Sequence, residues 1–182
     1  MRIIRGSLKK KKINPPKTFK GRPTTDQAKE GLFNILEGRF EIPEIEVLDL
    51  FSGTGNISYE FASRGCRKIT LVEKNHSNYR FILKTVAELG LKEIRTLKAD
   101  VFSILPKLYQ HSYDIIFADP PYDLAELIEI PEKVFQNHLL KRDGRLIVEH
   151  PAEVKFSGFP GFLETRKYGH VHFSFFSESN AL

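Results

Sequence analysis

The most constraining feature of the sequence is a short apolar run that ends in an acid, two prolines and an aromatic residue, Ile115-Ile116-Phe117-Ala118-Asp119-Pro120-Pro121-Tyr122. A continuous apolar run predicts a strand buried on both faces, as in a parallel sheet. Proline cannot donate a hydrogen bond to the ladder, so the strand must stop at Asp119. Each proline also fixes its own φ and restrains the preceding residue. A stiff carboxylate-bearing turn therefore lies at the carboxyl end of a strand, where open α/β sheets bind ligands.

The rest of the chain supplies the sheet that this strand needs. Strand patterns occur at residues 46–50, 68–73, 94–98, 113–119 and 145–149. Helix patterns lie between them at residues 57–64, 75–89, 101–109 and 124–140, and Pro131 must interrupt or restart the last one. Strands that alternate with helices predict an α/β fold with a doubly wound, mostly parallel sheet. Residues 162–168 and 171–176 then predict a terminal antiparallel hairpin.

The amino-terminal segment has a different pattern. Residues 1–13 predict a small hairpin that turns at Gly6-Ser7. A helix is predicted to open at Thr24, because Thr24 and Gln27 have capping-box spacing. Its apolar face then continues to Leu36.

Charge is distributed unevenly along the chain. The net charge is +5, but residues 1–22 carry nine basic and no acidic residues, and the rest carries 19 basic against 23 acidic residues. We therefore divide the chain into a basic arm, residues 1–22, and a single domain, residues 23–182. Arms of this kind bind polyanions, most often nucleic acid, and a solvated tail without a specific partner is the alternative. The basic residues of the arm are Arg2, Arg5, Lys9, Lys10, Lys11, Lys12, Lys17, Lys20 and Arg22.

Four successive predicted strands end in acidic residues, which are Asp49, Glu73, Asp100 and Asp119. Because the carboxyl ends of parallel strands meet at one edge of a sheet, we expect these side chains to line one ligand site. The first is followed by a loop, Phe51-Ser52-Gly53-Thr54-Gly55, whose glycines let the backbone approach a ligand. Ser58 stands where a dinucleotide-binding fingerprint has its third glycine, which weakens that interpretation. Glu73 suits a ribose diol, and Asp100-Val101 suits an adenine ring.

This combination of motifs resembles the class I S-adenosylmethionine-dependent methyltransferases, and the acid-Pro-Pro-aromatic tetrapeptide is typical of those that methylate amino nitrogens. A closer resemblance is to the bacterial 16S ribosomal RNA guanine-N2 methyltransferase family often called RsmD. It includes the segment Gly21-Arg22-Pro23-Thr24-Thr25-Asp26, the helix to Leu36 and the hairpin around Tyr168-Gly169, and so covers nearly the whole chain. The resemblance implies a Rossmann-like class I methyltransferase fold, S-adenosylmethionine as the cofactor, and small-subunit ribosomal RNA or an assembling small subunit as the partner.

The resemblance also implies roles for individual residues. The Asp119 carboxylate and the Pro120 carbonyl would accept hydrogen bonds from the guanine N2 amine, which favours a pyramidal nitrogen with an exposed lone pair. Tyr122 would stack on a base taken out of its helix. RNA binding is implied for Tyr122 and for the basic residues of the arm. Cofactor binding is implied for Arg22, Thr24, Asp49, Phe51, Ser52, Gly53, Thr54, Gly55, Glu73, Lys74, Asp100, Val101 and Asp119.

Other functions stay open at the level of sequence. Related motifs methylate adenine N6 in nucleic acid or the amide of a protein glutamine. The short chain argues against a DNA substrate, and an aspartate rather than an asparagine at position 119 argues against glutamine. A non-catalytic RNA-binding module with a degenerate cofactor site and a nicotinamide-dependent oxidoreductase are the alternatives from other classes.

The remaining candidates receive weaker assignments. His170 and His172 share one strand face without a third ligand, so we expect exposed histidines and no metal. Cys66 is the only cysteine and is expected to be buried. Glu149-His150, at the end of the fifth strand, is a candidate for lining the substrate entrance. We recognise no secretion signal or membrane span, and expect a cytoplasmic monomer.

Overall fold

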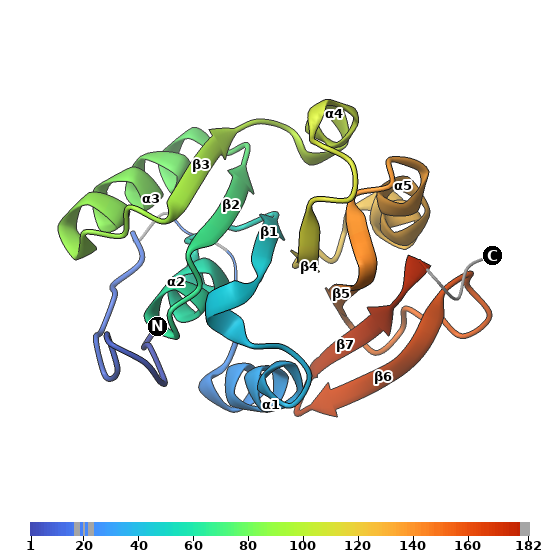
Figure 1. Cartoon of the computed structure of the whole chain (residues 1–182), viewed down its shortest axis with the longest axis horizontal. Coiled ribbons are helices and arrows are strands. Elements are labelled where there is room, and N and C mark those ends of the chain that lie inside the picture. Colours follow the sequence, from blue (N-terminus) through green and yellow to red (C-terminus); the bar gives the residue numbers. More distant parts are fainter. Residues whose placement is uncertain (17–18, 20, 22–23, 179–182) are drawn as a thin grey trace.

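A seven-stranded sheet forms the centre of the computed structural model, which describes residues 1–16, 19, 21 and 24–178 (Figure 1). The strand order is β3-β2-β1-β4-β5-β7-β6. The parallel strands are β1 (Glu46–Leu50), β2 (Lys68–Glu73), β3 (Ile94–Lys98), β4 (Tyr113–Ala118) and β5 (Leu140–His150). The antiparallel strands that close the sheet are β6 (Phe162–Tyr168) and β7 (Val171–Phe176). The predicted mostly parallel sheet with a terminal hairpin is therefore confirmed.

Helices cover both faces of the sheet and produce two cores (Figure 1). One face carries α1 (Asp26–Glu37), α2 (Asn56–Ser63) and α3 (His76–Leu89), and the other carries α4 (Val101–Ile104) and α5 (Ile130–Gln136). The short 3-10 helices are η1 (Ile42–Glu44), η2 (Leu105–Lys107) and η3 (Ala125–Glu129). Because side chains alternate along a strand, Phe117 of β4 points into the first core and Ala118 into the second. The strand is thus buried on both faces, as its apolar run predicts.

Helix α1 begins one residue later than the capping-box spacing predicts. Its N-cap is Thr25, whose side chain accepts a hydrogen bond from the Ala28 backbone N–H at 3.2 Å. The prediction that Thr24 caps this helix is wrong, because the Thr24 hydroxyl donates to Glu149 instead. Adjacent threonines are equivalent as local caps, so the tertiary hydrogen bond decides between them.

Strand β5 is longer than its apolar segment predicts. It begins at Leu140, and its register with β4 shifts between the pairs Tyr113–Leu140 and Ile115–Arg145. The prediction that this strand begins at residue 145 is therefore wrong, since Asp143-Gly144 forms an irregularity within β5 and not a turn before it. A Cβ on Gly144 would lie 3.0 Å from the Tyr113 carbonyl oxygen, so this glycine permits close approach of the two strands.

Two predicted helices are shorter in the structure. The helix expected over residues 101–109 is α4 followed by η2, which has Pro106 in its first turn. The helix expected over residues 124–140 is split into η3 and α5, with Pro131 in the first turn of α5, as its position predicts. The chain that follows α5 is used for the extension of β5.

The amino-terminal hairpin packs against the domain. Backbone hydrogen bonds join Ile3 to Lys11 and Met1 to Ile13 in antiparallel fashion. Ile3 and Ile13 are buried in the same core as α1 and α2. The lysines of the turn remain exposed. The division of the chain at residue 22 stays a prediction.

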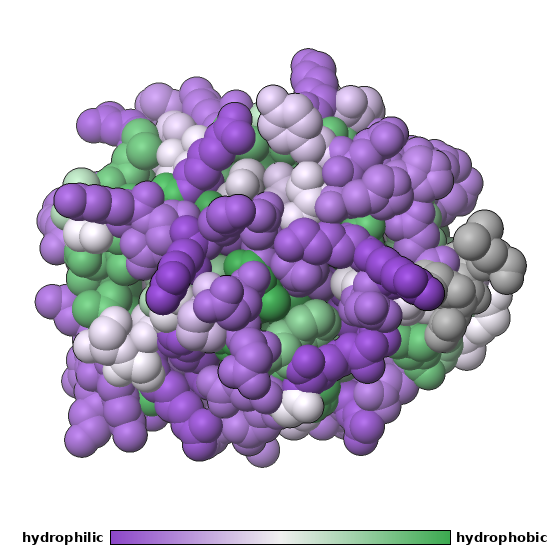
Figure 2. Space-filling model, in the orientation of Figure 1, coloured by the Kyte–Doolittle hydropathy of each residue, from purple (hydrophilic) through white to green (hydrophobic). Residues whose placement is uncertain are grey.

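Hydrophilic side chains cover most of the face seen in Figure 2, and the apolar patches between them are small. Among the helices of the described ranges, none has the length and apolar character needed to cross a membrane. Cys66 is buried, as predicted, and so are Phe173, Phe175 and Phe176, which pack in the two cores. The chemistry-bearing side chains must therefore be sought at the edge of the sheet.

Candidate functional site

The sheet brings the four strand-end acids to one edge. β3, β2, β1 and β4 are parallel neighbours, so their carboxyl ends lie side by side. Along this edge the acids follow in the order Asp100, Glu73, Asp49 and Asp119. Asp49 lies within β1, whereas Asp119 follows β4 directly. Their roles toward a ligand stay predictions, but their common location follows from the strand order.

The glycine loop after β1 has a left-handed backbone. Phe51, Gly53 and Gly55 have φ values of 57°, 56° and 81°. A Cβ on Gly55 would lie 2.6 Å from the Tyr59 ring, so no other residue fits there without a shift. A phenylalanine with positive φ costs about 1–3 kcal/mol and persists where the surroundings enforce it, commonly at ligand sites.

Glu73 holds this loop from the neighbouring strand. Its Oε2 accepts a hydrogen bond from the Gly53 N–H at 2.8 Å, and its Oε1 accepts one from the Asn75 N–H at 2.6 Å. Burial raises the pKa of Glu73. A carboxylate offers about four acceptor positions, so a ligand hydroxyl can still bind beside these backbone donors.

The residues predicted around an adenine ring lie farther along the same edge. Asp100 caps α4 by accepting from the Ser103 N–H at 3.2 Å, and Lys74 lies 3.5 Å from its carboxylate. Val101 is buried in the core between α4 and the sheet. The Phe51 ring packs edge-on against Phe102 at a centroid distance of 6.0 Å.

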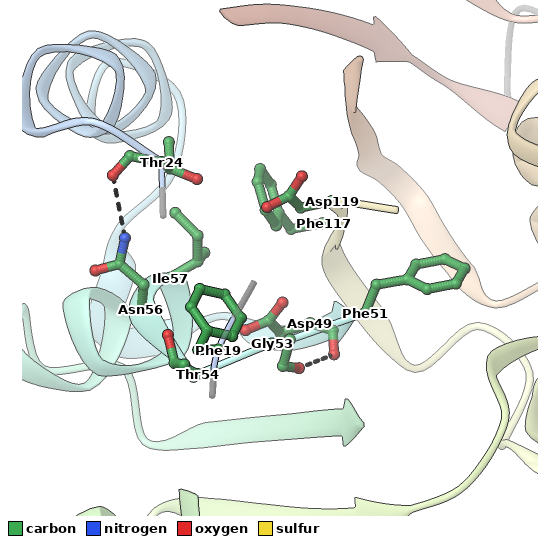
Figure 3. Close-up of a pocket in the computed structure, with 11 residues that line it drawn as sticks. Phe19, Thr24, Asp49, Phe51, Gly53, Thr54, Asn56, Ile57, Phe117 and Asp119 are labelled. Atoms are coloured by element: carbon green, nitrogen blue, oxygen red, sulfur yellow. Dashed lines mark hydrogen bonds between the residues drawn. The ribbon is translucent and has the colours of Figure 1, made fainter. Parts of the chain in front are cut away.

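A small cavity lies between the glycine loop, β4 and the segment before α1 (Figure 3). Its volume is about 30 Å³. Figure 3 shows the Asp49 and Asp119 side chains on facing sides of it. Phe19, which the sequence analysis does not identify, covers Gly53, since a Cβ added there would meet its ring at 3.5 Å. The lining residues are Phe19, Thr24, Asp49, Phe51, Ser52, Gly53, Thr54, Asn56, Ile57, Phe117 and Asp119.

The carboxyl groups around this cavity retain protons more readily than ordinary acids. Burial raises the pKa of Asp49 to about 7, although the Ser58 hydroxyl donates to it at 2.6 Å. Burial, then the charges of Glu149 and Asp49, raise the pKa of Asp119. Burial also raises the pKa of Glu149 to about 7. Such a site favours a cation, whose charge would stabilise the ionised carboxylates.

The sequence has recognisable relatives. A family model described as Conserved hypothetical protein 95 matches residues 1–177. The chain belongs to this family. The Escherichia coli K12 protein named Ribosomal RNA small subunit methyltransferase D is 30% identical over 153 residues, which are 84% of this chain and 76% of that protein. A Buchnera aphidicola protein of the same name is 31% identical over 149 residues, 82% of this chain and 75% of that protein.

Two solved structures resemble this chain over nearly its whole length. The Escherichia coli protein yhhF, whose name proposes a methyltransferase, is 27% identical, covers 97% of each chain and has a TM-score of 0.81. A hypothetical protein from Thermus thermophilus is also 27% identical, with a TM-score of 0.82 over 97% of this chain and 99% of that one. The Rossmann-like methyltransferase fold and the resemblance to the RsmD-like family are therefore confirmed.

Glu149 belongs to the site of this family member more closely than the sequence analysis indicates. It is 2% exposed at the end of β5. Its Oε2 accepts from the Thr24 hydroxyl at 2.8 Å, and its Oε1 accepts from the Tyr122 hydroxyl at 3.4 Å. Its place at the end of β5 already makes it a candidate for the substrate entrance, whereas its hydrogen bonds to Thr24 and Tyr122 join segments that are distant in sequence and could not be predicted.

Only some of the predicted RNA-binding residues lie in the part of the chain that the structure describes. Lys17, Lys20 and Arg22 lie outside the described residues. The Tyr122 side chain is 48% exposed beside Asp119, and Pro120 is buried. The exposed basic side chains of the hairpin are Arg2, Arg5, Lys9, Lys10, Lys11 and Lys12.

The histidines occupy different positions from those expected. His170 lies in the turn before β7, so the prediction that it shares a strand face with His172 is wrong. His172 faces His150 across the β5–β7 ladder, with ring centroids 5.8 Å apart. Among the described residues, no three His, Cys, Asp or Glu side chains form a group that could hold a metal ion.

Raising the pH from about 6 to about 8 is expected to lower thermal stability. Asp49 and Glu149 keep protons up to about pH 7 when folded, whereas the unfolded chain loses them near about pH 4. Their contribution is therefore present at low pH and lost as the pH rises through the folded pKa. Burial lowers the pKa of His150, so this histidine favours the folded state more at higher pH. It is one group, however, against the two acids Asp49 and Glu149. Scanning calorimetry should show a shallower dependence in Asp49→Asn, and an unchanged dependence would contradict this assignment.

Proposed function

We propose that this chain transfers a methyl group from S-adenosylmethionine to the exocyclic N2 amine of a guanine in small-subunit ribosomal RNA. The observation that carries the proposal is the position of Asp119, which follows β4 directly, lines the cavity beside the glycine loop and is followed by Pro120. The names of the Escherichia coli and Buchnera relatives support the choice of small-subunit ribosomal RNA. The wider class of reaction is supported by the same names and by the methyltransferase name of the Escherichia coli structure.

The chain's own groups fit this cofactor. When bound, it supplies an electrophilic methyl group on a sulfonium cation. The acid-lined cavity suits a cation, and the Glu73 carboxylate has lone pairs free for a ribose diol. Asp100 and Val101 are proposed to hold the adenine ring, and Lys74, Thr24 and Arg22 are proposed as further cofactor contacts. The Phe19 ring lies over Gly53 at this cavity, so we propose that it shifts when the cofactor binds.

The residues at the end of β4 account for the activation of the amine. The lone pair of a nucleobase amine is delocalised into the ring, which makes it a poor nucleophile. Hydrogen bonds from its two N–H groups to the Asp119 carboxylate and the Pro120 carbonyl favour a pyramidal nitrogen. Tyr122, half exposed beside them, offers a face for a base outside its stack. Acceleration then comes from positioning and electrostatics.

The basic hairpin is proposed to bind the phosphate backbone. Its exposed cations surround a turn that is held to the domain by Ile3 and Ile13. Lys17, Lys20 and Arg22 extend the same run of basic sequence and are proposed to continue this surface. We further propose a monomer that acts in the cytoplasm on the RNA or on an assembling small subunit.

Product mapping tests this function. The purified chain is incubated with labelled S-adenosylmethionine and with total RNA, naked small-subunit RNA or small-subunit particles, and the modified nucleoside is identified. N2-methylguanosine in small-subunit RNA is the expected product. N6-methyladenosine would favour the adenine alternative. Absence of cofactor binding by calorimetry would favour a non-catalytic RNA-binding module, and binding of NAD instead would favour an oxidoreductase.

Removing cations from the hairpin is expected to weaken RNA binding and its dependence on salt. In the double variant Lys11→Gln/Lys12→Gln, the slope of log affinity against log salt should fall by about 1–2, because each lost phosphate contact removes about 0.7–0.9 from the slope. The double variant Lys84→Gln/Lys92→Gln, which removes two exposed lysines elsewhere, is the control. Equal slopes in the two variants would show that the hairpin does not contact RNA.

A further inference from the structure

Glu149 is a buried carboxylate that the proposed reaction does not use directly. It lies at the end of β5 and is 2% exposed. It joins the segment before α1 to the turn after β4, since Thr24 and Tyr122 each donate to one of its oxygens. The two segments are 98 residues apart in the sequence, so no local structure holds them together.

Thr24 is itself fixed on its other side. Its carbonyl oxygen accepts from the Asn56 side-chain amide at 3.2 Å, which is drawn in Figure 3. The Asn56 Oδ1 in turn accepts from the buried Lys29 ammonium at 3.1 Å. Lys29 also donates to the Arg2 carbonyl in the amino-terminal hairpin. Glu149 is therefore held by a network of buried hydrogen bonds, and Tyr122 is the more exposed group at its end.

A carboxylate at this position is costly for folding. Burial of Glu149 disfavours its charged form, and its charge also raises the pKa of the neighbouring Asp119. A buried acid beside a second acid is a feature that stability alone would not favour, since an apolar side chain would avoid both penalties. A side chain that costs folding stability in this way is commonly found where it serves function, so we infer that Glu149 has a role in the site.

We propose that Glu149 is a positioning residue that fixes the Tyr122 ring beside the amine acceptors Asp119 and Pro120. The inference rests on the proposed function, because it assigns Glu149 a part in placing the base. Glu149 accepts the Tyr122 hydroxyl on one oxygen and is anchored to Thr24 through the other. A base that stacks on the ring then meets the acceptors in one orientation, which is the condition for fast transfer between positioned groups.

Single-turnover methyl transfer at saturating cofactor and RNA measures this role. Glu149→Ala is expected to slow the transfer step by about 10- to 100-fold, because displacement of a positioned group by about 1 Å has effects of this size. The dissociation constant of S-adenosylmethionine and the melting temperature at pH 8 should change little. Glu149→Gln, which keeps one acceptor oxygen, should restore part of the rate. Glu153→Ala, which removes an exposed acid a few residues later, is the matched control.

A double-mutant cycle separates positioning through Tyr122 from a general structural role. Tyr122→Phe keeps the stacking face and removes only the hydroxyl. If Glu149 acts through that hydroxyl, Tyr122→Phe/Glu149→Ala should be no slower than Glu149→Ala alone. Additive losses, or a normal rate in Glu149→Ala, would overturn the inference while leaving the proposed function intact. Wild-type protein that transfers no methyl group to the RNA would overturn both.

Discussion

Replacing Asp119 with alanine is expected to slow methyl transfer to small-subunit RNA by about 100-fold or more while cofactor binding survives. Removing one preorganised group that stabilises a transition state typically costs about 100- to 1,000-fold. Asp119 lines the cavity at the end of β4, whereas the glycine loop is held independently by Glu73. The rate is measured in a single turnover with labelled cofactor, and cofactor affinity is measured by calorimetry.

The same substitution is expected to leave the protein at least as stable as wild type at pH 8. Burial and the charges of Glu149 and Asp49 raise the pKa of Asp119, so its ionised form destabilises the folded state at that pH. Asp119→Asn keeps one acceptor oxygen without the charge and should have intermediate activity. The control is Asp143→Ala, which removes an exposed aspartate within β5. An active Asp119→Ala enzyme would refute the proposed mechanism.

The main features of the site follow from local sequence rules. In a chain of alternating strands and helices, an apolar run stopped by two prolines predicts a strand that ends there, and the carboxyl ends of such strands meet at one edge of the sheet. Asp49, Glu73, Asp100 and Asp119 are therefore found together without any knowledge of tertiary contacts. The glycine loop is predictable because glycine adopts positive φ values readily, as Gly53 and Gly55 do. Phe51 also has a positive φ, which the surrounding fold imposes and the sequence does not indicate.

Contacts between distant segments were not predictable in this way. Either Thr24 or Thr25 can cap α1, and only the presence of Glu149 on β5 decides which does so. Gly144 has the sequence signature of a turn, yet it serves the close approach of β5 to β4. The Phe19 ring over Gly53 is a contact between residues that are far apart in sequence, for which no periodic pattern exists.

The amino-terminal hairpin depends on a buried ion pair that sequence rules also miss. Lys29 on α1 and Glu60 on α2 are both fully buried, with Nζ 3.3 Å from Oε2. The Glu60 carboxylate also accepts the backbone N–H groups of Ile4 and Arg5 at 2.9 and 3.0 Å. Lys29 falls on the apolar face of its helix, where a lysine would ordinarily be exposed. The pair thus joins the hairpin to both helices.

Lys29→Met is expected to lower the free energy of unfolding by about 3–5 kcal/mol, because it leaves a buried carboxylate without one of its cations. Urea unfolding measures the loss, and trypsin should cleave the hairpin lysines faster. Lys84→Met, which breaks an exposed pair with Glu88, should be close to wild type in both assays.

The double variant Lys29→Met/Glu60→Gln tests whether the charge pair itself is responsible. Its loss of stability should be smaller than the sum of the two single losses, because the second substitution removes the buried charge that has lost one of its two cations, Lys29 and Arg64. RNA affinity should fall in the variants whose hairpin trypsin cleaves faster. Cofactor affinity should change less, since the glycine loop is held by Glu73. A Lys29→Met protein with wild-type stability and wild-type protease resistance would show that Lys29 does not hold the hairpin to the domain.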